Sequence, residues 1–499
     1  MSHTPHRGMV AAGHELTAQA GARVLREGGN AVDAALAAML TSFVAEPLLT
    51  GLGSGGYMLV AGAGERPTLL DFFVAAPGRG RGRCPTPPAV AKLLPVEVSF
   101  DDAVQVFHVG TSSCGTYGAP AGVCAAAARW GSLPLADLAT PAAALARSGV
   151  ALNAQQAYVA RILGQLLLST PECAGLWAPA GRVLGEGDVL IDGDLGDALQ
   201  RLGSDGAEPF YRGDLAGAVC GWLEPRGGVI TAQDLRDYKA IEREPVRVSY
   251  RGADVLTNPP PSAGGTLLAY SLTLLERGPA PPTLPSVVAA MQAAQVRRTD
   301  AFLDGLADPG FLESFLASHL GCTTHIAVLD GDGRACSVTT SNGEGSGVIV
   351  PHTGIHLNNM MGEQDLNPMG FHRHPPGRRM PSMMAPSVVL DQDRVRLVVG
   401  SAGSNRIRSA ILQTIVGVVD HGLRAKEAVD APRVHFEEAT VYAEPGIDPV
   451  ALEQVGHPVA HFRAPNLFFG GVQAIECDPL TGEVSGAGDP RRGGVAVAA

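Results

Sequence analysis

A short segment beyond the middle of the chain, Gly321-Cys322-Thr323-Thr324-His325, carries residue types that could perform acyl chemistry. Thr323 follows a long, mostly helical region and opens a run with the composition of a β-strand. Cleavage of the bond between Cys322 and Thr323 would give Thr323 a free α-amine beside its own hydroxyl. An α-amine has a pKa of about 7.7–8.0, so part of it is neutral near pH 7 and can accept the hydroxyl proton. One residue would then supply both nucleophile and base, although the pentapeptide alone is also typical of an ordinary strand.

A glycine-rich stretch at residues 51–56, Gly-Leu-Gly-Ser-Gly-Gly, matches the pattern of a dinucleotide-binding loop. Such a loop requires a strand before the glycines and a helix after them, so that the helix N-terminus meets the pyrophosphate. Here the expected helix precedes the glycines and the expected strand follows them. The order favours a tight backbone crossing next to an active site over a nucleotide site.

Four histidines lie close together in the sequence and could suggest a metal site: His352, His356, His372 and His374. No cysteine or paired carboxylate stands at a ligand spacing from them, and a Pro-Pro-Gly sequence follows at residues 375–377. We therefore interpret them as polar loop residues and expect no metal.

The elements that must position these residues are predicted from hydrophobic spacing. Helices are expected over residues 16–27, 30–44, 122–129, 136–148, 195–202, 215–223, 263–275 and 406–419, and Asn30 is the expected N-cap of the second. A strand is expected over 57–60, with hairpins at 326–330 with 335–340 and at 387–390 with 395–400. The Gly-, Arg- and Pro-rich residues 78–95 are expected to form a mobile loop. The elements do not alternate as in a parallel doubly wound sheet, which favours an α+β fold.

Composition bounds the class of protein. The chain has 499 residues, of which 45% are hydrophobic and 17% charged, so a large core is available and global disorder is excluded. The net charge of -12 argues against nucleic-acid binding. The longest apolar stretch near the N-terminus has about 12 residues, too few to cross a bilayer, and we see no secretory signal. The eight cysteines form no CxxC pair, which is typical of a reducing compartment, so no membrane contact and a cytoplasmic location are expected.

Ordered blocks of sequence make the chain similar to the γ-glutamyltranspeptidase family from about residue 8 to about residue 491. The matching blocks are residues 8–11, 28–35, 46–47, 50–56, 244–252, 258–265, 323–325 and 489–491. The resemblance implies a four-layer αββα sandwich of the N-terminal nucleophile hydrolase type. It also implies a precursor that cuts itself between Cys322 and Thr323. Residues 1–322 and 323–499 would stay associated as one domain, because their strands share sheets.

The same resemblance implies an activity. Thr323 would attack the γ-amide of a γ-glutamyl donor such as glutathione and pass the acyl group to water, an amino acid or a peptide. The family stabilises the tetrahedral intermediate with backbone N–H groups, and Gly403 and Ser404 occupy that segment here. Ser341 stands where the family has a second threonine that bonds the nucleophile. No cofactor is expected, because nucleophile, base and oxyanion donors would all come from the chain.

The implied substrate pocket departs from the best-known members of the family. In ungapped register the usual asparagine falls on Gly343, with Asn342 one place away. Met360 replaces a glutamine, and Glu363 becomes the acidic ligand for the substrate amine. Ser382 keeps one hydroxyl of a serine pair whose other member is a proline.

No arginine aligns cleanly with the family's clamp for the substrate α-carboxylate. Arg81 is the candidate, between Arg79 and Arg83 in the Gly/Arg-rich segment. A bidentate arginine is the best partner for a carboxylate, so this position bears on specificity. Two alternatives therefore stay open. One is an amidase with the same nucleophile for another acyl group, such as a glutaryl β-lactam side chain or a γ-glutamyl polymer. The other is an unprocessed, non-catalytic member.

Overall fold

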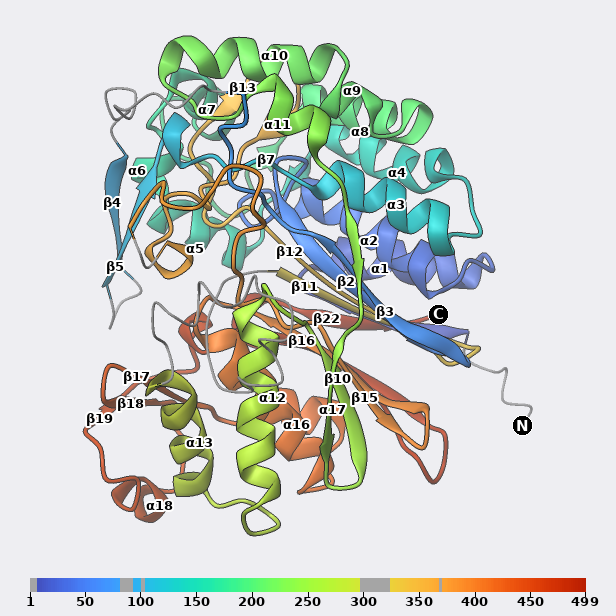
Figure 1. Cartoon of the computed structure of the whole chain (residues 1–499), viewed down its shortest axis with the longest axis vertical. Coiled ribbons are helices and arrows are strands. Elements are labelled where there is room, and N and C mark those ends of the chain that lie inside the picture. The colour runs from blue at the N-terminus through green and yellow to red at the C-terminus, as the bar shows by residue number, and fades with distance from the viewer. Residues whose placement is uncertain (1–6, 81–92, 100–103, 297–323, 368–369) are drawn as a thin grey trace.

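Two β-sheets lie face to face at the centre of the chain, and helices cover the outer face of each (Figure 1). The computed structural model describes residues 7–80, 93–99, 104–296, 324–367 and 370–499. The layers are thus helix, sheet, sheet and helix, which confirms the predicted αββα sandwich.

The first sheet contains seven strands, and each neighbouring pair is antiparallel. Their order is β22 (Val495–Ala498), β1 (Gly8–Ala12), β11 (Thr324–Asp330), β12 (Arg334–Ser341), β2 (Gly55–Gly62), β3 (Glu65–Phe72) and β8 (Ile241–Arg243). Strands that follow residue 323 in the chain therefore lie between strands that precede it.

The second sheet has six strands, also antiparallel. Their order is β21 (Val484–Gly488), β20 (Gly471–Cys477), β16 (Arg394–Ala402), β15 (Ser387–Asp391), β10 (Ala253–Thr257) and β9 (Val246–Tyr250). Smaller pairings lie outside the two sheets: β4 (Leu94–Ser99) with β5 (Val104–Val109), β6 (Val150–Ala151) with β7 (Val189–Leu190), β13 (Ile349–Val350) with β14 (Ile355–His356), and β17 (Val434–Glu437) with β18 (Thr440–Ala443) and β19 (Val459–His461).

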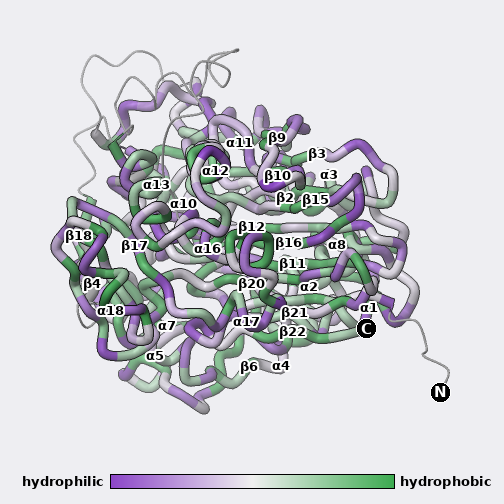
Figure 2. Tube along the Cα trace, turned by 90° about the horizontal axis from the view of Figure 1, so that it is seen from below, coloured by the Kyte–Doolittle hydropathy of each residue, from purple (hydrophilic) through white to green (hydrophobic). Residues whose placement is uncertain are grey.

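Apolar residues on alternate faces of the strands build three separate core layers, because successive side chains of a strand point in opposite directions. On β2, Met58 packs with the helices of the first face, whereas Leu59 packs between the sheets. On β16, Leu397 packs with the helices of the second face and Val398 between the sheets. The central strands are accordingly hydrophobic along much of their length (Figure 2).

The first sheet packs under a larger set of helices than the second. Over and beside it lie α1 (Glu15–Arg26), α2 (Ala31–Ala45), α3 (Ala119–Trp130), α4 (Leu135–Ser148), α5 (Ala154–Ile162), α6 (Gly164–Leu167), α7 (Pro171–Trp177), α8 (Gly193–Asp205), α9 (Glu208–Tyr211), α10 (Asp214–Leu223) and α11 (Ala232–Asp237). On the other side lie α12 (Ala263–Glu276), α13 (Leu284–Val296), α16 (Arg406–Val419), α17 (Ala425–Asp430) and α18 (Pro449–Glu453). No helix in the part of the chain that the model describes is long and apolar enough to span a membrane.

The predicted helices and hairpins are confirmed to within a few residues at their ends, and Asn30 caps α2 in a capping box with Asp33. The glycine crossing is also confirmed, because α2 precedes it and β2 follows. A Cβ on Gly53 would lie 2.1 Å from the carbonyl oxygen of His356. The predicted loop over residues 78–95 was wrong at its end. Leu94 begins β4, which pairs with β5 in a small antiparallel hairpin.

Candidate active site

The ends of β12 and β16 meet at a cavity in the protein surface. Four residues singled out in the sequence lie on its wall: Ser341, Gly343, Gly403 and Ser404. The start of β11 is beside them, since Thr324 pairs with Thr340 across the sheet, one position before Ser341. The predicted nucleophile Thr323 and its neighbour Cys322 lie outside the described residues.

A tight turn follows Ser341 at the cavity wall. The Ser341 hydroxyl accepts a 2.7 Å hydrogen bond from the Gly343 N–H. Gly343 has a φ of +65°, and a Cβ there would lie 2.0 Å from Asn359 Oδ1 and 2.2 Å from Glu363 Oε1. The buried Glu363 carboxyl therefore sits directly against this turn. Only glycine satisfies both the backbone angle and the close approach.

The side chains of two other predicted substrate residues form hydrogen bonds with the protein backbone. Asn342 is buried, and its Nδ2 donates to the carbonyl of His356 at 3.1 Å, while its Oδ1 has no hydrogen-bond partner among the described residues. Ser382 accepts the N–H of Met384 at 3.1 Å and does not line the cavity beside Ser341. Arg81 lies outside the described residues. Neighbouring Arg79 pairs with Asp237 at 3.0 Å.

The strand end at Gly403 and Ser404 reaches the cavity through two consecutive positive φ angles, +115° and +56°. Their carbonyls accept the N–H groups of Arg406 and Ile407, where α16 begins. A Cβ on Gly403 would lie 2.8 Å from the α-carbon of Gly470 and 3.3 Å from Nη2 of Arg492. The absence of a side chain lets these segments close around the cavity. The role of the two N–H groups as oxyanion donors stays a prediction.

An adjoining cavity contains a buried acid that the sequence analysis did not single out. Its wall includes Gly13, His14, Glu46, Trp177 and Arg492. Glu46 accepts hydrogen bonds from the hydroxyl of Thr17 at 3.0 Å and from that of Thr324 at 3.1 Å. Burial raises the pKa of Glu46 to about 7, although both hydroxyls and the Arg492 charge oppose the rise. One signal was present in the sequence, because an acid directly follows the mostly apolar helix α2.

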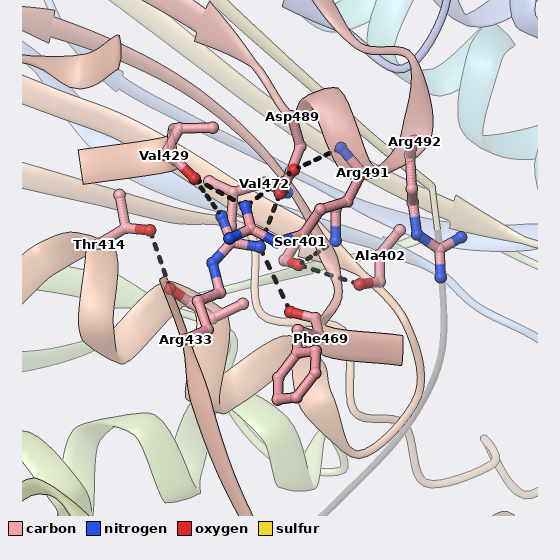
Figure 3. Close-up of polar contacts among 12 residues, drawn as sticks. Ser401, Ala402, Thr414, Val429, Arg433, Phe469, Val472, Asp489, Arg491 and Arg492 are labelled. Atoms are coloured by element: carbon pink, nitrogen blue, oxygen red, sulfur yellow. Dashed lines mark hydrogen bonds and ion pairs between the residues drawn. The ribbon is translucent and has the colours of Figure 1, made fainter. Parts of the chain in front are cut away.

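Arg492 was missed as well, because the family block in the sequence ended at its neighbour. Arg491 binds Asp489 at 3.2 Å and Glu444 at 2.5 Å, and Arg433 binds Asp489 at 2.6 Å. Arg492 points away from this cluster (Figure 3) and lines both cavities. Of these two adjacent arginines, Arg491 therefore lies in a buried ion-pair cluster and Arg492 lies at the candidate site.

The four histidines lie in different environments. His352 is exposed and 3.7 Å from Asp194, whereas His356 is partly buried, and burial of its ring lowers its pKa to about 4. His374 is bonded to the Leu366 carbonyl at 3.0 Å. Among the described residues, no group of three or more histidines, cysteines or acids has the geometry to hold a metal ion.

Comparisons with known proteins agree with this architecture. A family model described as gamma-glutamyltranspeptidase matches residues 17–499. The chain is 32% identical to the "Acylase ACY 1 proenzyme" of Pseudomonas sp. (strain SE83), over 99% of this chain and 93% of that one. It is 31% identical to the "Glutathione hydrolase proenzyme" of Escherichia coli (strain K12), over 97% and 90%. The solved cephalosporin acylase from Bacillus halodurans superposes with a TM-score of 0.85 at 27% identity, over 99% of this chain and 96% of that one. With a nearly full-length match and a shared N-terminal nucleophile hydrolase fold, the chain belongs to the γ-glutamyltranspeptidase family.

Proposed function

We propose that the chain is a self-processing enzyme that cleaves γ-glutamyl amide bonds and passes the acyl group to water, an amino acid or a peptide. The observation that supports this proposal most directly is the meeting of Ser341, Gly403 and Ser404 at one cavity beside the start of β11. The Ser341 hydroxyl at the end of the first sheet and the backbone of Gly403 and Ser404 at the end of the second converge there, which suits an acyl-transfer site. The proposal requires the β11–β12 register to extend by one residue, which would bring Thr323 opposite Ser341.

In the proposed mechanism the Thr323 hydroxyl first attacks the carbonyl carbon of Cys322. The C–N bond breaks, the Thr323 nitrogen takes a proton, and water hydrolyses the resulting ester. The freed α-amine then accepts the hydroxyl proton as Thr323 attacks the donor amide. Backbone N–H groups of Gly403 and Ser404 stabilise the tetrahedral oxyanion. The leaving amine departs with a proton, and water or an acceptor amine releases the glutamyl group from the ester.

Intact-mass measurement with N-terminal sequencing tests the proposal. Two fragments are expected, the smaller beginning at Thr323, and Thr323→Ala should stay whole. Thr323→Ser, which keeps a hydroxyl, should still be cleaved, but more slowly. A single 51.4 kDa species from folded wild-type protein would contradict the mechanism and favour a non-catalytic member of the family.

A second candidate function is hydrolysis of another acyl group, as the acylase alternative holds. Aliphatic side chains make up much of the cavity wall beside Ser341: Leu48, Leu49, Val159, Ile162, Leu163 and Leu467. Met360, which replaces a polar residue of the family, is buried in the layer between the sheets and does not line this cavity. The aliphatic wall suits an acyl chain with fewer polar groups than glutamate.

Turnover of γ-glutamyl and glutaryl anilides separates the two candidates. The glutaryl group lacks the α-amine that Glu363 would bind, and a site built for a polar group rejects an analogue that lacks it. For a γ-glutamyl enzyme we expect at least about 100-fold preference for the γ-glutamyl anilide. Glu363→Gln should lower that preference with little effect on glutaryl turnover. Equal turnover of both anilides by wild type would favour the acylase.

A further inference from the structure

Glu46 joins three segments that are distant in sequence. It is the first residue after α2, where its N–H donates to the Ser42 carbonyl at 2.8 Å. One carboxyl oxygen accepts from Thr17 on α1, and the other from Thr324, the first residue of β11. All three side chains are at most 5% exposed. The carboxyl group therefore sets how the start of β11 lies against the two helices.

The backbone around Glu46 leaves the carboxyl group little freedom. A Cβ on Gly13 would lie 2.6 Å from Glu46 Oε2 and 3.7 Å from Thr324 Oγ1, so the residue at this position must be small. An ionised carboxylate accepts both threonine hydroxyls. A neutral carboxyl carries a proton on one oxygen, so the hydroxyl facing that oxygen must turn around or lose its bond.

We propose that Glu46 is a positioning residue for the nucleophile: as a carboxylate it holds the hydroxyl of Thr324, and it loosens that hold when it takes up a proton. One peptide bond separates Thr324 from Thr323, so the inference rests on the proposed function. It adds a proton-dependent control that acts through the start of β11. The raised pKa of Glu46 places this control near neutral pH.

Other ionisable groups face the same region and must be distinguished from Glu46. Arg492 lines the cavity beside Glu46, and its charge favours the carboxylate. His14 lines the cavity too, and burial lowers its pKa below 6.5. His356, which is bonded to the backbone of Pro47, has a pKa that partial burial lowers to about 4. Burial therefore lowers the pKa of both histidines, whereas it raises the pKa of Glu46.

The rate of self-cleavage as a function of pH tests the proposal, because the precursor has no free amine at Thr323. Precursor pulse-labelled by cell-free translation is diluted into buffers from pH 5 to pH 9, and the fragments are followed over time. The wild-type rate should fall as the pH drops through about 7. Glu46→Gln should be slower at pH 8 by about 10- to 100-fold, with no such fall. Glu15→Gln, which removes an exposed acid at the start of α1, should keep the wild-type profile.

A second pair of variants covers the case in which Glu46→Gln fails to fold. Thr324→Val removes the hydroxyl that Glu46 would hold, so self-cleavage should be slower at pH 8 and the fall near pH 7 should disappear, as in Glu46→Gln. Thr324→Ser should restore the wild-type profile. An unchanged profile in Glu46→Gln or in Thr324→Val would overturn the proposal. A wild-type precursor that never splits would instead overturn the proposed function, and the role of Glu46 toward a nucleophile with it.

Discussion

Two buried carboxyl groups, Asp489 in the core and Glu46 at the candidate site, meet opposite electrostatic environments. Burial opposes the ionised form of both. At Asp489 the charges of Arg433 and Arg491, together with the backbone N–H groups of Val472 and Arg491, outweigh burial, so its pKa is lowered. At Glu46 two neutral hydroxyls and the Arg492 charge do not, so its pKa is raised. Compensation of the buried charge, rather than burial itself, distinguishes the group that fixes the fold from the group that can exchange a proton near pH 7.

The core side of this comparison predicts the largest effect. Arg433 is buried and binds Asp489 as well as the carbonyls of Val429 and Phe469. Arg433→Met would leave the carboxylate and these carbonyls undercompensated, so we expect a loss of about 3–5 kcal/mol in unfolding free energy. Urea unfolding in the Thr323→Ala background, where the chain stays whole, measures it. Arg147→Met, which breaks an exposed pair with Asp197, should cost less than about 1 kcal/mol. Equal losses would contradict the comparison.

Isosteric variants of the two acids should differ in the sign of their pH dependence. Glu46 has a folded pKa above its unfolded value of 4.5, so its stabilisation is present at low pH and is lost as the pH rises to about 7. Relative to Glu46→Gln, wild type should lose about 3 kcal/mol over this range. Asp489 has a lowered pKa, so the advantage of wild type over Asp489→Asn should instead be lost as the pH falls. Unfolding from pH 2 to pH 8 measures both slopes, that of Asp489 below about pH 4 and that of Glu46 between about pH 4.5 and pH 7, and slopes of the same sign would refute the assignment.

At the cavity wall, we expect the cost of a substitution in unfolding free energy to come from close packing rather than from charge pairing. Gly343→Ala combines a positive φ with a clash against Asn359 and Glu363, so we expect a loss of about 2–3 kcal/mol and a higher KM for a γ-glutamyl donor. Gly333→Ala has a φ of +82° but open space around it, so it should cost only about 1 kcal/mol. Thermal unfolding of both variants separates strain from contact. Equal losses of unfolding free energy in the two variants would show that the clash at Gly343 adds nothing to the backbone strain.

The adjacent arginines give the smallest and most selective test. Arg492→Gln removes a charge that favours ionised Glu46. The pH at which the self-cleavage rate falls should therefore rise by less than about one pH unit. Its unfolding free energy should change by less than about 1 kcal/mol. Arg491→Gln should instead destabilise the protein strongly, because its guanidinium compensates Asp489 and Glu444. The expected contrast fails if both variants behave alike.

Much of the fold was predictable from local sequence patterns. Helical spacing located α2, α12 and α16, an Asp/Gly turn located the first hairpin, and the polar connection over residues 391–394 located the second. Strands β1, β9 and β22 were not predicted. The run Val-Ala-Val-Ala of β22 is short and partly exposed, and β1, its partner, lies almost five hundred residues away. Such strands exist because of their neighbours in the sheet, and this information is not local.

The candidate site was predictable only where a resemblance or a glycine pattern marked it. Ser341, Gly403 and Ser404 do share a cavity. The sequence marked Glu46 as an acid after an apolar helix but not its role, because its two hydroxyl partners lie 29 and 278 positions away. Nothing in the sequence states that Arg491 and Arg492 point in different directions, since this depends on the backbone of the short helix at Pro490–Arg492.

The interleaving of strands from before and after residue 323 has a kinetic consequence. In the uncut chain, refolding would be a unimolecular reaction. A cut between Cys322 and Thr323 would make it bimolecular, because β11 and β12 would have to find β1 and β2 on another polypeptide. Recovery of the mature protein would then depend on concentration. Its lifetime would be governed by the barrier to opening the shared sheets rather than by an equilibrium between folded and unfolded forms.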